Sequence, residues 1–202
     1  SYPEEIPDPK DFTKEHIEEI RRFTSEDSRR NTAGTPLDFF DAVYDSANRL
    51  SVESHISRVS FLGKYTNIHS QIAKPLARVE KRILQLAKED PEVQTFINRL
   101  ARCDSYNWRE IGDRNSRSFH SYGIAVDILP KGWGKKNIYW AWRRDIDPDN
   151  WMNLSLERRW MPPVSVIKAF EKEGFIWGGK WIIWDDMHFE YHPELIDYNN
   201  LR

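Results

Sequence analysis

Cysteine is almost absent from this sequence of 202 residues: Cys103 is the single thiol, which excludes an internal disulfide. Long apolar runs are also absent, so no segment reaches the length that spans a bilayer, and the mean hydropathy is -0.74. The formal net charge is -2, and without a strongly basic stretch the chain lacks the electrostatic signature of a nucleic-acid partner. A chain of this length can bury a sufficient hydrophobic core without stabilisation by disulfides or structural metal ions. We therefore expect one globular monomer with no membrane span and no nucleic-acid partner.

Tryptophan is absent from the first half of the chain, where the sequence pattern is that of helices. Thr13 and Thr35 stand as N-caps before apolar residues at helical spacing. A shorter helix is predicted at Val52–Phe61, and the strongest helical periodicity runs from Ile72 to Leu86. No cluster of chemically reactive groups occurs in residues 1–100. We expect these residues to form an almost entirely helical extension or subdomain.

The character of the sequence changes after residue 100, where all nine tryptophans lie. Most of them are expected in the core of a small sheet, while Trp177, Trp181 and Trp184 remain candidates for the wall of a groove that binds sugar or peptide. One helix is predicted at Pro163–Glu173. Short strands are predicted at Ser105–Ile111, Ile124–Leu129, Ile138–Trp142 and Met187–Tyr191. The fold class is therefore α+β, with a small antiparallel sheet in residues 101–202 that carries the chemistry.

Two residues with metal-binding side chains, His120 and Asp127, lie seven positions apart around Gly123. In a straight strand they would be ~23 Å apart at ~3.3 Å per residue, whereas two donor atoms on one metal ion lie only ~3–3.5 Å apart. They can share an ion only if the chain turns back at Gly123, which can adopt backbone angles closed to other residues. Asp127 stands between Val126 and Ile128, where a buried carboxylate needs a cation or an arginine. On spacing alone, a metal-binding pair and a buried ion-pair acid beside a loop histidine are equally supported.

His188 is the best candidate for a third ligand, because its rival His192 precedes a proline and has the pattern of a surface turn. Alternation along a final strand places Asp186, His188 and Glu190 on one face. Asp185, three positions before His188, needs a bend to reach the same ion. Both aspartates are therefore candidates for a general base, and the periodicity slightly favours Asp186.

The two stretches carry the motifs Ser118-x-His120-x-x-Gly123-x-Ala125-x-Asp127 and Asp185-x-x-His188. In these motifs and in their order, the sequence resembles the zinc D-alanyl-D-alanine carboxypeptidase/dipeptidase family. That family includes vancomycin-resistance D,D-peptidases and phage L-alanyl-D-glutamate endolysins, and it shares its fold with the hedgehog signalling domain. The resemblance covers about residues 100–195. The predicted helical half matches no motif of the family.

The resemblance implies a hedgehog/DD-peptidase-like sheet that binds Zn2+ through His120, Asp127 and His188. It assigns the general base to the acid three positions before the last histidine, which is Asp185, and leaves Asp186 as a supporting group. Three protein ligands leave one coordination position open, which is the layout of a catalytic zinc site.

The family also uses an upstream arginine to bind the substrate and to stabilise the transition state. Arg109 is the best match for this catalytic arginine and Arg117 is the second choice, although an ordinary surface arginine explains Arg109 equally well. The further substrate-binding candidates around the motifs are Ser118, Tyr122, Arg117 and Trp184.

The implied activity is that of a zinc metallopeptidase acting on peptidoglycan stem peptides, in the first place a D,D-carboxypeptidase that releases terminal D-alanine. The alternatives are an L-alanyl-D-glutamate endopeptidase and a non-catalytic, zinc-stabilised binding module. Retention of the three ligands and of Asp185 argues against the non-catalytic module. Because such a substrate lies in the periplasm or cell envelope, we expect an exported protein whose leader is not part of this sequence.

Overall fold

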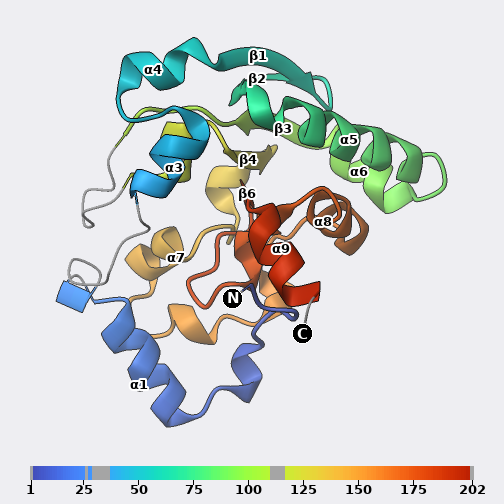
Figure 1. Cartoon of the computed structure of the whole chain (residues 1–202). Helices are drawn as coiled ribbons and strands as arrows, with labels where there is room; N and C mark the ends of the chain where they lie inside the picture. Colours follow the sequence, from blue (N-terminus) through green and yellow to red (C-terminus); the bar gives the residue numbers. More distant parts are fainter. Residues whose placement is uncertain (1, 26, 29–36, 110–116, 201–202) are drawn as a thin grey trace.

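The computed structural model describes residues 2–25, 27–28, 37–109 and 117–200, and Figure 1 shows the arrangement of its helices and strands. In chain order the elements are η1 (Pro9–Asp11), α1 (Lys14–Phe23), α3 (Leu37–Tyr44), α4 (Arg49–Ser54), β1 (Ile56–Phe61), β2 (Lys64–His69), α5 (Ser70–Leu86), α6 (Pro91–Asn98), β3 (Leu100–Asp104), η2 (Phe119–Tyr122), β4 (Ala125–Pro130), η3 (Trp133–Lys135), α7 (Trp140–Ile146), η4 (Trp151–Asn153), η5 (Leu156–Arg158), α8 (Val164–Glu171), β5 (Phe175–Trp177), η6 (Gly178–Lys180), β6 (His188–Tyr191) and α9 (Pro193–Asn200). Within these described ranges, no helix is both long and apolar enough to cross a membrane.

An antiparallel sheet of four strands, in the order β3-β4-β6-β5, forms the centre of the molecule. Along β4, Val126 and Ile128 belong to the hydrophobic core, so Asp127 between them projects from the opposite face. Along β6, Phe189 belongs to the same core, and His188 projects with Asp127 from the other face. The α+β class and the antiparallel sheet are confirmed.

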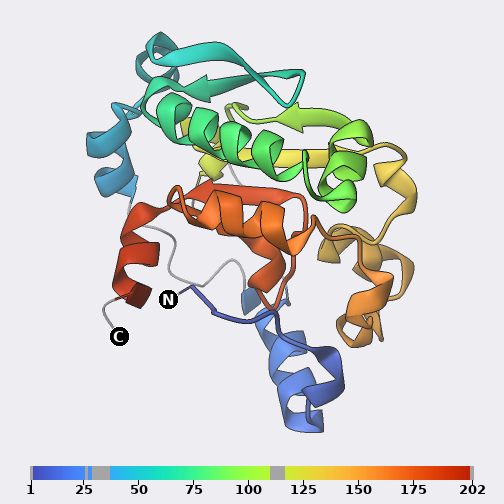
Figure 2. The same ribbon diagram turned by 90° about the vertical axis from the view of Figure 1, so that its right-hand side faces the viewer.

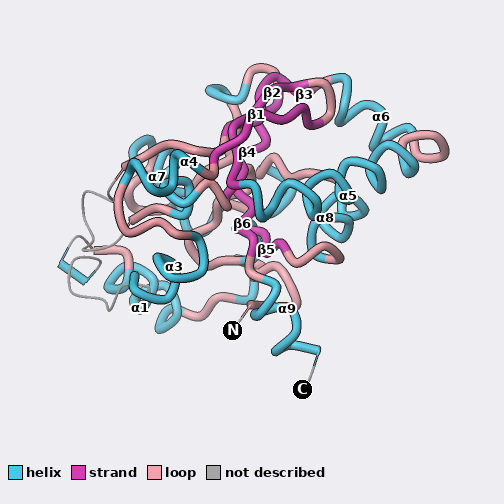
Figure 3. The backbone as a smooth tube through the Cα atoms, turned by 45° about the horizontal axis from the view of Figure 1, so that its top comes forward, coloured by secondary structure: helices cyan, strands magenta, loops and turns pink. Residues whose placement is uncertain are grey.

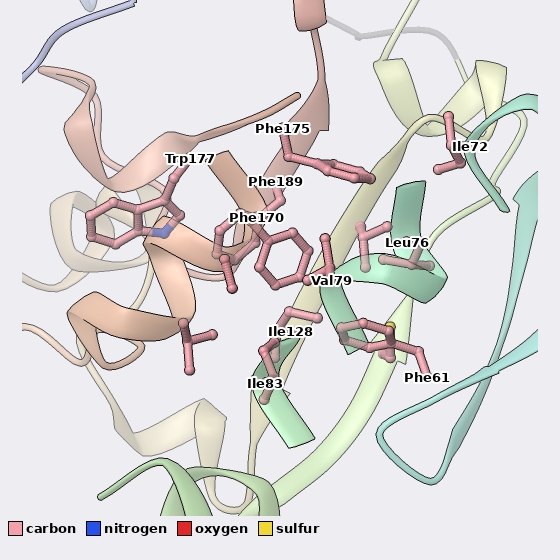
Figure 4. Close-up of a cluster of buried hydrophobic side chains, with 14 of the residues drawn as sticks. Phe61, Ile72, Leu76, Val79, Ile83, Ile128, Phe170, Phe175, Trp177 and Phe189 are labelled. Carbon is pink, nitrogen blue, oxygen red and sulfur yellow. The ribbon is translucent and has the colours of Figure 1, made fainter. Parts of the chain in front are cut away.

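Helices α5 and α8 cover one face of this sheet (Figure 2). In Figure 3 the strands form a central band, with α5, α6 and α8 on one side of it and α3, α4 and α7 on the other. The covered face is filled by the side chains in Figure 4, where Phe170 of α8 stacks on Phe189 with ring centroids 3.9 Å apart. Burial of this apolar face supplies the main stabilisation and leaves the opposite face to the polar side chains of β4 and β6.

Residues 1–100 are not almost entirely helical, because β1 and β2 form an antiparallel hairpin. The helix predicted at Val52–Phe61 is wrong: α4 ends at Ser54 and the chain then enters β1. Leu62 and Gly63 join the strands with φ angles of 48° and 74°, as a two-residue hairpin turn requires. Leucine is an unusual residue in this conformation, and its N–H donates to Glu80 Oε1 on α5 at 2.6 Å. A short apolar run fits helix and strand alike, and this turn lacks the usual residues that signal a hairpin.

Other predicted elements are found with altered boundaries. Thr13 caps α1 as predicted, and its Oγ1 accepts the N–H of His16 at 3.2 Å. The helix predicted to start at Thr35 has its first residues outside the described part of the chain, and α3 ends at Tyr44. The helix predicted at Pro163–Glu173 and the strands predicted at Ile124–Leu129 and Met187–Tyr191 correspond to α8, β4 and β6.

Two predicted strands are not observed in their predicted places. The residues Ile138–Trp142 contribute one isolated bridge, between Tyr139 and Asp185, and α7 begins at Trp140. The strand predicted at Ser105–Ile111 lies earlier, as β3 at Leu100–Asp104, and its last predicted residues, 110 and 111, lie outside the described residues.

One hydrophobic cluster draws on both halves of the chain. It contains Leu76 and Val79 of α5 together with Phe170 of α8 and Phe189 of β6. The division predicted at residue 100 therefore marks a change of sequence pattern, while the core is continuous across it.

Candidate metal centre

The predicted reversal of the chain at Gly123 is confirmed. Ser118 caps the short helix η2 by accepting the N–H of His120 at 3.3 Å, and Gly123 ends the helix with a φ of 69°. A Cβ at this position would lie 2.7 Å from Cδ1 of Ile56 and 2.8 Å from the backbone nitrogen of His69. Glycine is therefore required both for the backbone angle and for the close approach of β1 and β2.

The reversal brings His120 next to Asp127, and strand β6 places the side chain of His188 beside both of them. Nδ1 of His188 lies 2.8 Å from Oδ1 of Asp127 and 3.2 Å from Nε2 of His120. Nε2 of His120 lies 3.2 Å from Oδ2 of Asp127. These separations match those of donor atoms bound ~2.0 Å from one tetrahedral ion. His120, Asp127 and His188 are the group of described residues that could hold a metal ion together.

The second nitrogen of each histidine ring has its own partner, which fixes the ring orientation. Nδ1 of His120 lies 2.8 Å from the carbonyl oxygen of Ser105, and Nε2 of His188 lies 2.8 Å from Oε1 of Glu190. Such contacts hold a metal-binding histidine in the required tautomer and raise its basicity as a ligand. The contact with Glu190 was not predicted as part of the site, although alternation along the strand had placed both residues on one face.

The electrostatic surroundings of the centre are those that attract a cation. Burial lowers the pKa of His188, but hydrogen bonds to Asp127 and Glu190 outweigh this and raise that pKa well above its ordinary value. Burial raises the pKa of Asp127, but the charges and hydrogen bonds of His120 and His188 hold it well below its ordinary range. A metal ion would take the place of the proton that His188 retains in this negative environment.

Asp185 lies near His188 and Asp127, and one oxygen of its carboxylate lacks a hydrogen-bond partner among the described residues. Its Oδ1 atom is buried and accepts no hydrogen bond from any described residue. Burial raises the pKa of Asp185 well above its ordinary value; nearby His188 lowers it, and Asp127 raises it further. The backbone of Asp185 is fixed, since its N–H donates to the carbonyl of Gly178 at 3.0 Å and its Cα pairs with that of Tyr139. An acid with one buried, unpartnered oxygen beside a possible metal site is a candidate for proton transfer.

Residues 112–191 match the model of a protein family described as D-alanyl-D-alanine carboxypeptidase. The match supports a relationship between these residues and that peptidase family. The matched range, called the peptidase segment below, includes His120, Asp127, Asp185 and His188, whereas Arg109 precedes it. No curated protein and no solved structure matches the chain with significance. The resemblance found in the two motifs is thus confirmed over the peptidase segment.

Within the peptidase segment, Asp186 occupies a different environment from its neighbour Asp185. Both of its carboxylate oxygens pair with the guanidinium of Arg159, one of them through Nε at 3.0 Å. Arg159 also donates to the carbonyl of Gly179 at 2.9 Å, and the indole of Trp177 donates to the carbonyl of Asp186 at 2.9 Å. This buried ion pair anchors the loop that carries Asp185. Arg159 was missed because nothing in its sequence surroundings distinguishes it from a surface arginine.

The two arginines considered as substrate ligands differ in their partners. Arg117 of the peptidase segment forms an ion pair with Asp41 of α3, and its guanidinium lies over the rings of Tyr122 and Trp108 at 4.6 and 5.1 Å. Arg109 is exposed, and its N–H donates to Oγ of Ser121, the neighbour of His120, at 3.0 Å. The charge of Arg117 is therefore paired with that of Asp41. The backbone of Arg109 is hydrogen-bonded to η2, the short helix that contains His120.

The remaining substrate-binding candidates of the peptidase segment are buried or half-buried. Tyr122 is 1% exposed and Trp184 is 4% exposed, which makes both of them packing residues, so the substrate-binding roles predicted for them have no support in their placement. Ser118 is half-buried and serves as the cap of η2. Trp181 is half-buried beside the centre, with its ring centroid 5.7 Å from that of His188.

The sequence context of His192 had predicted a surface turn, and this prediction is wrong. The residue is buried, and its Nε2 lies 3.3 Å from Oε2 of Glu190 while its Nδ1 lies 2.8 Å from Oε1 of Glu194. His192 and His188 thus contact different carboxylate oxygens of Glu190.

Proposed function

We propose that this chain is a zinc metallopeptidase that hydrolyses the stem peptides of peptidoglycan. The observation that carries the proposal is a group of three possible metal donors beside Asp185, whose Oδ1 atom is buried without a hydrogen-bond partner among the described residues, in a segment that matches the model of a D-alanyl-D-alanine carboxypeptidase family. Structural zinc sites have four protein ligands, whereas catalytic sites have three and an open position.

Zinc is the metal that suits this donor set. Two imidazole nitrogens and one carboxylate oxygen, from His120, His188 and Asp127, form a mixed nitrogen and oxygen set with tetrahedral spacing. When bound, the zinc ion would lower the pKa of a water molecule and polarise the scissile carbonyl.

Asp185 acts as the general base in this mechanism. It accepts a proton from the attacking water molecule and returns it to the leaving amine. Burial raises the pKa of Asp185, which favours acceptance of a proton by its carboxylate, and a cation at the neighbouring donors would favour the ionised form. The loop held by Arg159 keeps the carboxylate in position.

Arg109 is the arginine that we assign to substrate binding. Its side chain is exposed and has no ion-pair partner among the described residues, while Arg117 already pairs with Asp41. A guanidinium can bind a terminal carboxylate through two parallel hydrogen bonds or stabilise the oxyanion that develops at the scissile carbonyl.

The first substrate in this proposal is a stem pentapeptide that ends in D-alanyl-D-alanine, from which the terminal D-alanine is released. An L-alanyl-D-glutamate endopeptidase is the second candidate, since the motifs are shared by both activities. With either substrate, the protein acts in the periplasm or cell envelope.

Incubation of the zinc-loaded chain with a muropeptide pentapeptide, followed by mass analysis of the products, tests the proposal. Release of D-alanine is the expected result, and cleavage after L-alanine would instead assign the endopeptidase activity. The matched control is the zinc-loaded Asp185→Ala variant, which should release neither product. Absence of any product from the zinc-loaded native chain would overturn the catalytic assignment and leave a metal-stabilised binding module.

A further inference from the structure

Three aromatic side chains form a continuous cluster at the start of α7, called the aromatic ledge below: Trp133, Tyr139 and Trp142. The ring centroids of Trp133 and Trp142 are 5.3 Å apart, and those of Tyr139 and Trp142 are 5.5 Å apart at an interplanar angle of 88°. Trp142 is 38% exposed, and the other two residues are half-buried. The rings therefore hold one another in fixed orientations and still reach the surface.

The aromatic ledge begins at the proposed general base. Tyr139 pairs directly with Asp185 in an antiparallel bridge, and directly opposite side chains of such a bridge lie on the same face. The flanking hydrogen bonds fix this pairing: the N–H of Asp186 donates to Ile138 at 2.9 Å and the N–H of Trp140 donates to Trp184 at 3.0 Å. The part of a substrate that extends from Asp185 toward Tyr139 would therefore contact the aromatic ledge.

The exposed residues that flank Trp133 along the chain include three lysines. Lys131, Lys135 and Lys136 are exposed, and none of them forms an ion pair with any residue that the structure describes. The arginines of α7 do not add to this charge, because Arg143 and Arg144 pair with aspartates of their own helix and its end. Three uncompensated lysines complement the free carboxylates of a peptide stem.

We propose that the aromatic ledge binds the glycan strand to which the stem peptide is attached. Exposed aromatic rings provide flat apolar surface for the faces of N-acetylated sugar rings, and the lysines meet the carboxylates of adjacent stems. This subsite rests on the proposed function, and it makes glycan-linked stems, and not free peptides, the preferred substrate. Binding energy from such a remote part of a substrate favours correct positioning at the reacting bond.

A membrane surface is the other partner that tryptophan and lysine side chains fit, and Ile146 of α7 is 74% exposed. The glycan is favoured because the aromatic ledge is continuous with Asp185, and because two of its rings, Trp133 and Tyr139, are half-buried against Trp142 and the core. A ring that inserts into a bilayer projects from the protein surface, whereas Trp133 and Tyr139 are half-buried and can offer only part of a ring to a flat ligand.

Binding of a neutral N-acetylglucosamine trimer to the zinc-loaded chain, measured by titration calorimetry, tests the aromatic part of this subsite. Trp142→Ala should weaken binding about tenfold, as expected for the loss of one stacking ring, and Trp142→Phe should restore most of the affinity. The matched control is Tyr65→Ala, which removes an aromatic ring that is 69% exposed on the hairpin and should leave the affinity unchanged. Equal affinity of Trp142→Ala and the native chain would overturn the proposal.

A second arm of the experiment tests the lysines and the membrane alternative. The double variant Lys135→Ala, Lys136→Ala should weaken binding to glycan-linked pentapeptide severalfold and leave binding to the neutral trimer unchanged. Binding to phosphatidylglycerol vesicles that is lost in Trp142→Ala, without trimer binding by the native chain, would assign the aromatic ledge to a membrane. Trimer binding without any peptide cleavage would refute the proposed function and keep the subsite. Peptide cleavage without trimer binding would support the proposed function and refute the glycan subsite.

Discussion

Asp127 and His188 face each other directly across the antiparallel strands β4 and β6, with Oδ1 and Nδ1 2.8 Å apart. Two of the three candidate metal donors are thus one cross-strand pair, whose separation is set by the geometry of the sheet. The third donor, His120, reaches them because the chain reverses at Gly123. The metal centre therefore depends on one strand register and one turn.

The turn at Gly123 predicts a large difference between two glycine substitutions. At Gly132, which has a φ of 70°, an added Cβ would meet no atom within 4 Å, whereas at Gly123, with a φ of 69°, it would meet atoms at 2.7 and 2.8 Å. Gly132→Ala should lower the free energy of unfolding by about 1–2 kcal/mol, the cost of the left-handed conformation. Gly123→Ala should lower it by about 3 kcal/mol or more, because steric strain is added. Urea unfolding of both metal-free variants measures this, and equal losses would refute the requirement for close approach.

The contact between Glu190 and His188 predicts an effect on metal affinity. Glu190→Gln removes the charge that faces Nε2 of His188, and loss of such a partner typically weakens metal binding about 10- to 100-fold. A zinc competition titration with a chelator of known affinity measures the change. Glu194→Gln is the matched control, since Glu194 contacts His192 and no metal donor. If both variants bind zinc as tightly as the native chain, Glu190 does not support the ligand.

The buried carboxylate of Glu173 predicts part of the pH dependence of stability. Burial raises the pKa of Glu173, but hydrogen bonds from Arg78 and Arg82 outweigh this and leave the pKa below its ordinary value. A carboxyl group whose pKa is lowered by folding stabilises the protein above its unfolded pKa of about 4.3, and this contribution is lost as the pH falls through the folded pKa.

Glu173→Gln should therefore lower the free energy of unfolding at pH 7 and reduce its fall between about pH 5 and pH 3. Urea unfolding of the metal-free native and variant chains across this range measures the difference. Glu18→Gln, which changes an exposed acid of α1, is the control. A constant difference between Glu173→Gln and the native chain at every pH would exclude the ion pair as its source.

The motifs and the alternation of β4 and β6 were sufficient to predict which side chains come together at the candidate metal centre. The need for a turn followed from the spacing of His120 and Asp127, and the face shared by His188 and Glu190 followed from the period of a strand. The prediction could not extend to Arg159, because its ion pair with Asp186 joins residues 27 positions apart through tertiary packing alone.

The hairpin of β1 and β2 shows why the first half of the chain was harder to predict. Its turn places Leu62 at a positive φ, a conformation that sequence rules reserve for glycine, asparagine and aspartate. The hydrogen bond from Leu62 to Glu80 belongs to the packed structure and leaves no local signal. The burial of Tyr122, Trp184 and His192 could not be predicted from the sequence either. Aromatic residues and histidines near a motif are found both in the walls of binding sites and in protein cores.

The most direct test of the proposed peptidase compares the zinc content and turnover of Asp185→Ala and His120→Ala with those of the native chain, using a muropeptide pentapeptide as substrate. Asp185→Ala should retain one equivalent of zinc and lose turnover at least ~100-fold, as expected for a missing general base. His120→Ala should lose both zinc and turnover. Full turnover by zinc-loaded Asp185→Ala would contradict the assignment of the base and the mechanism built on it.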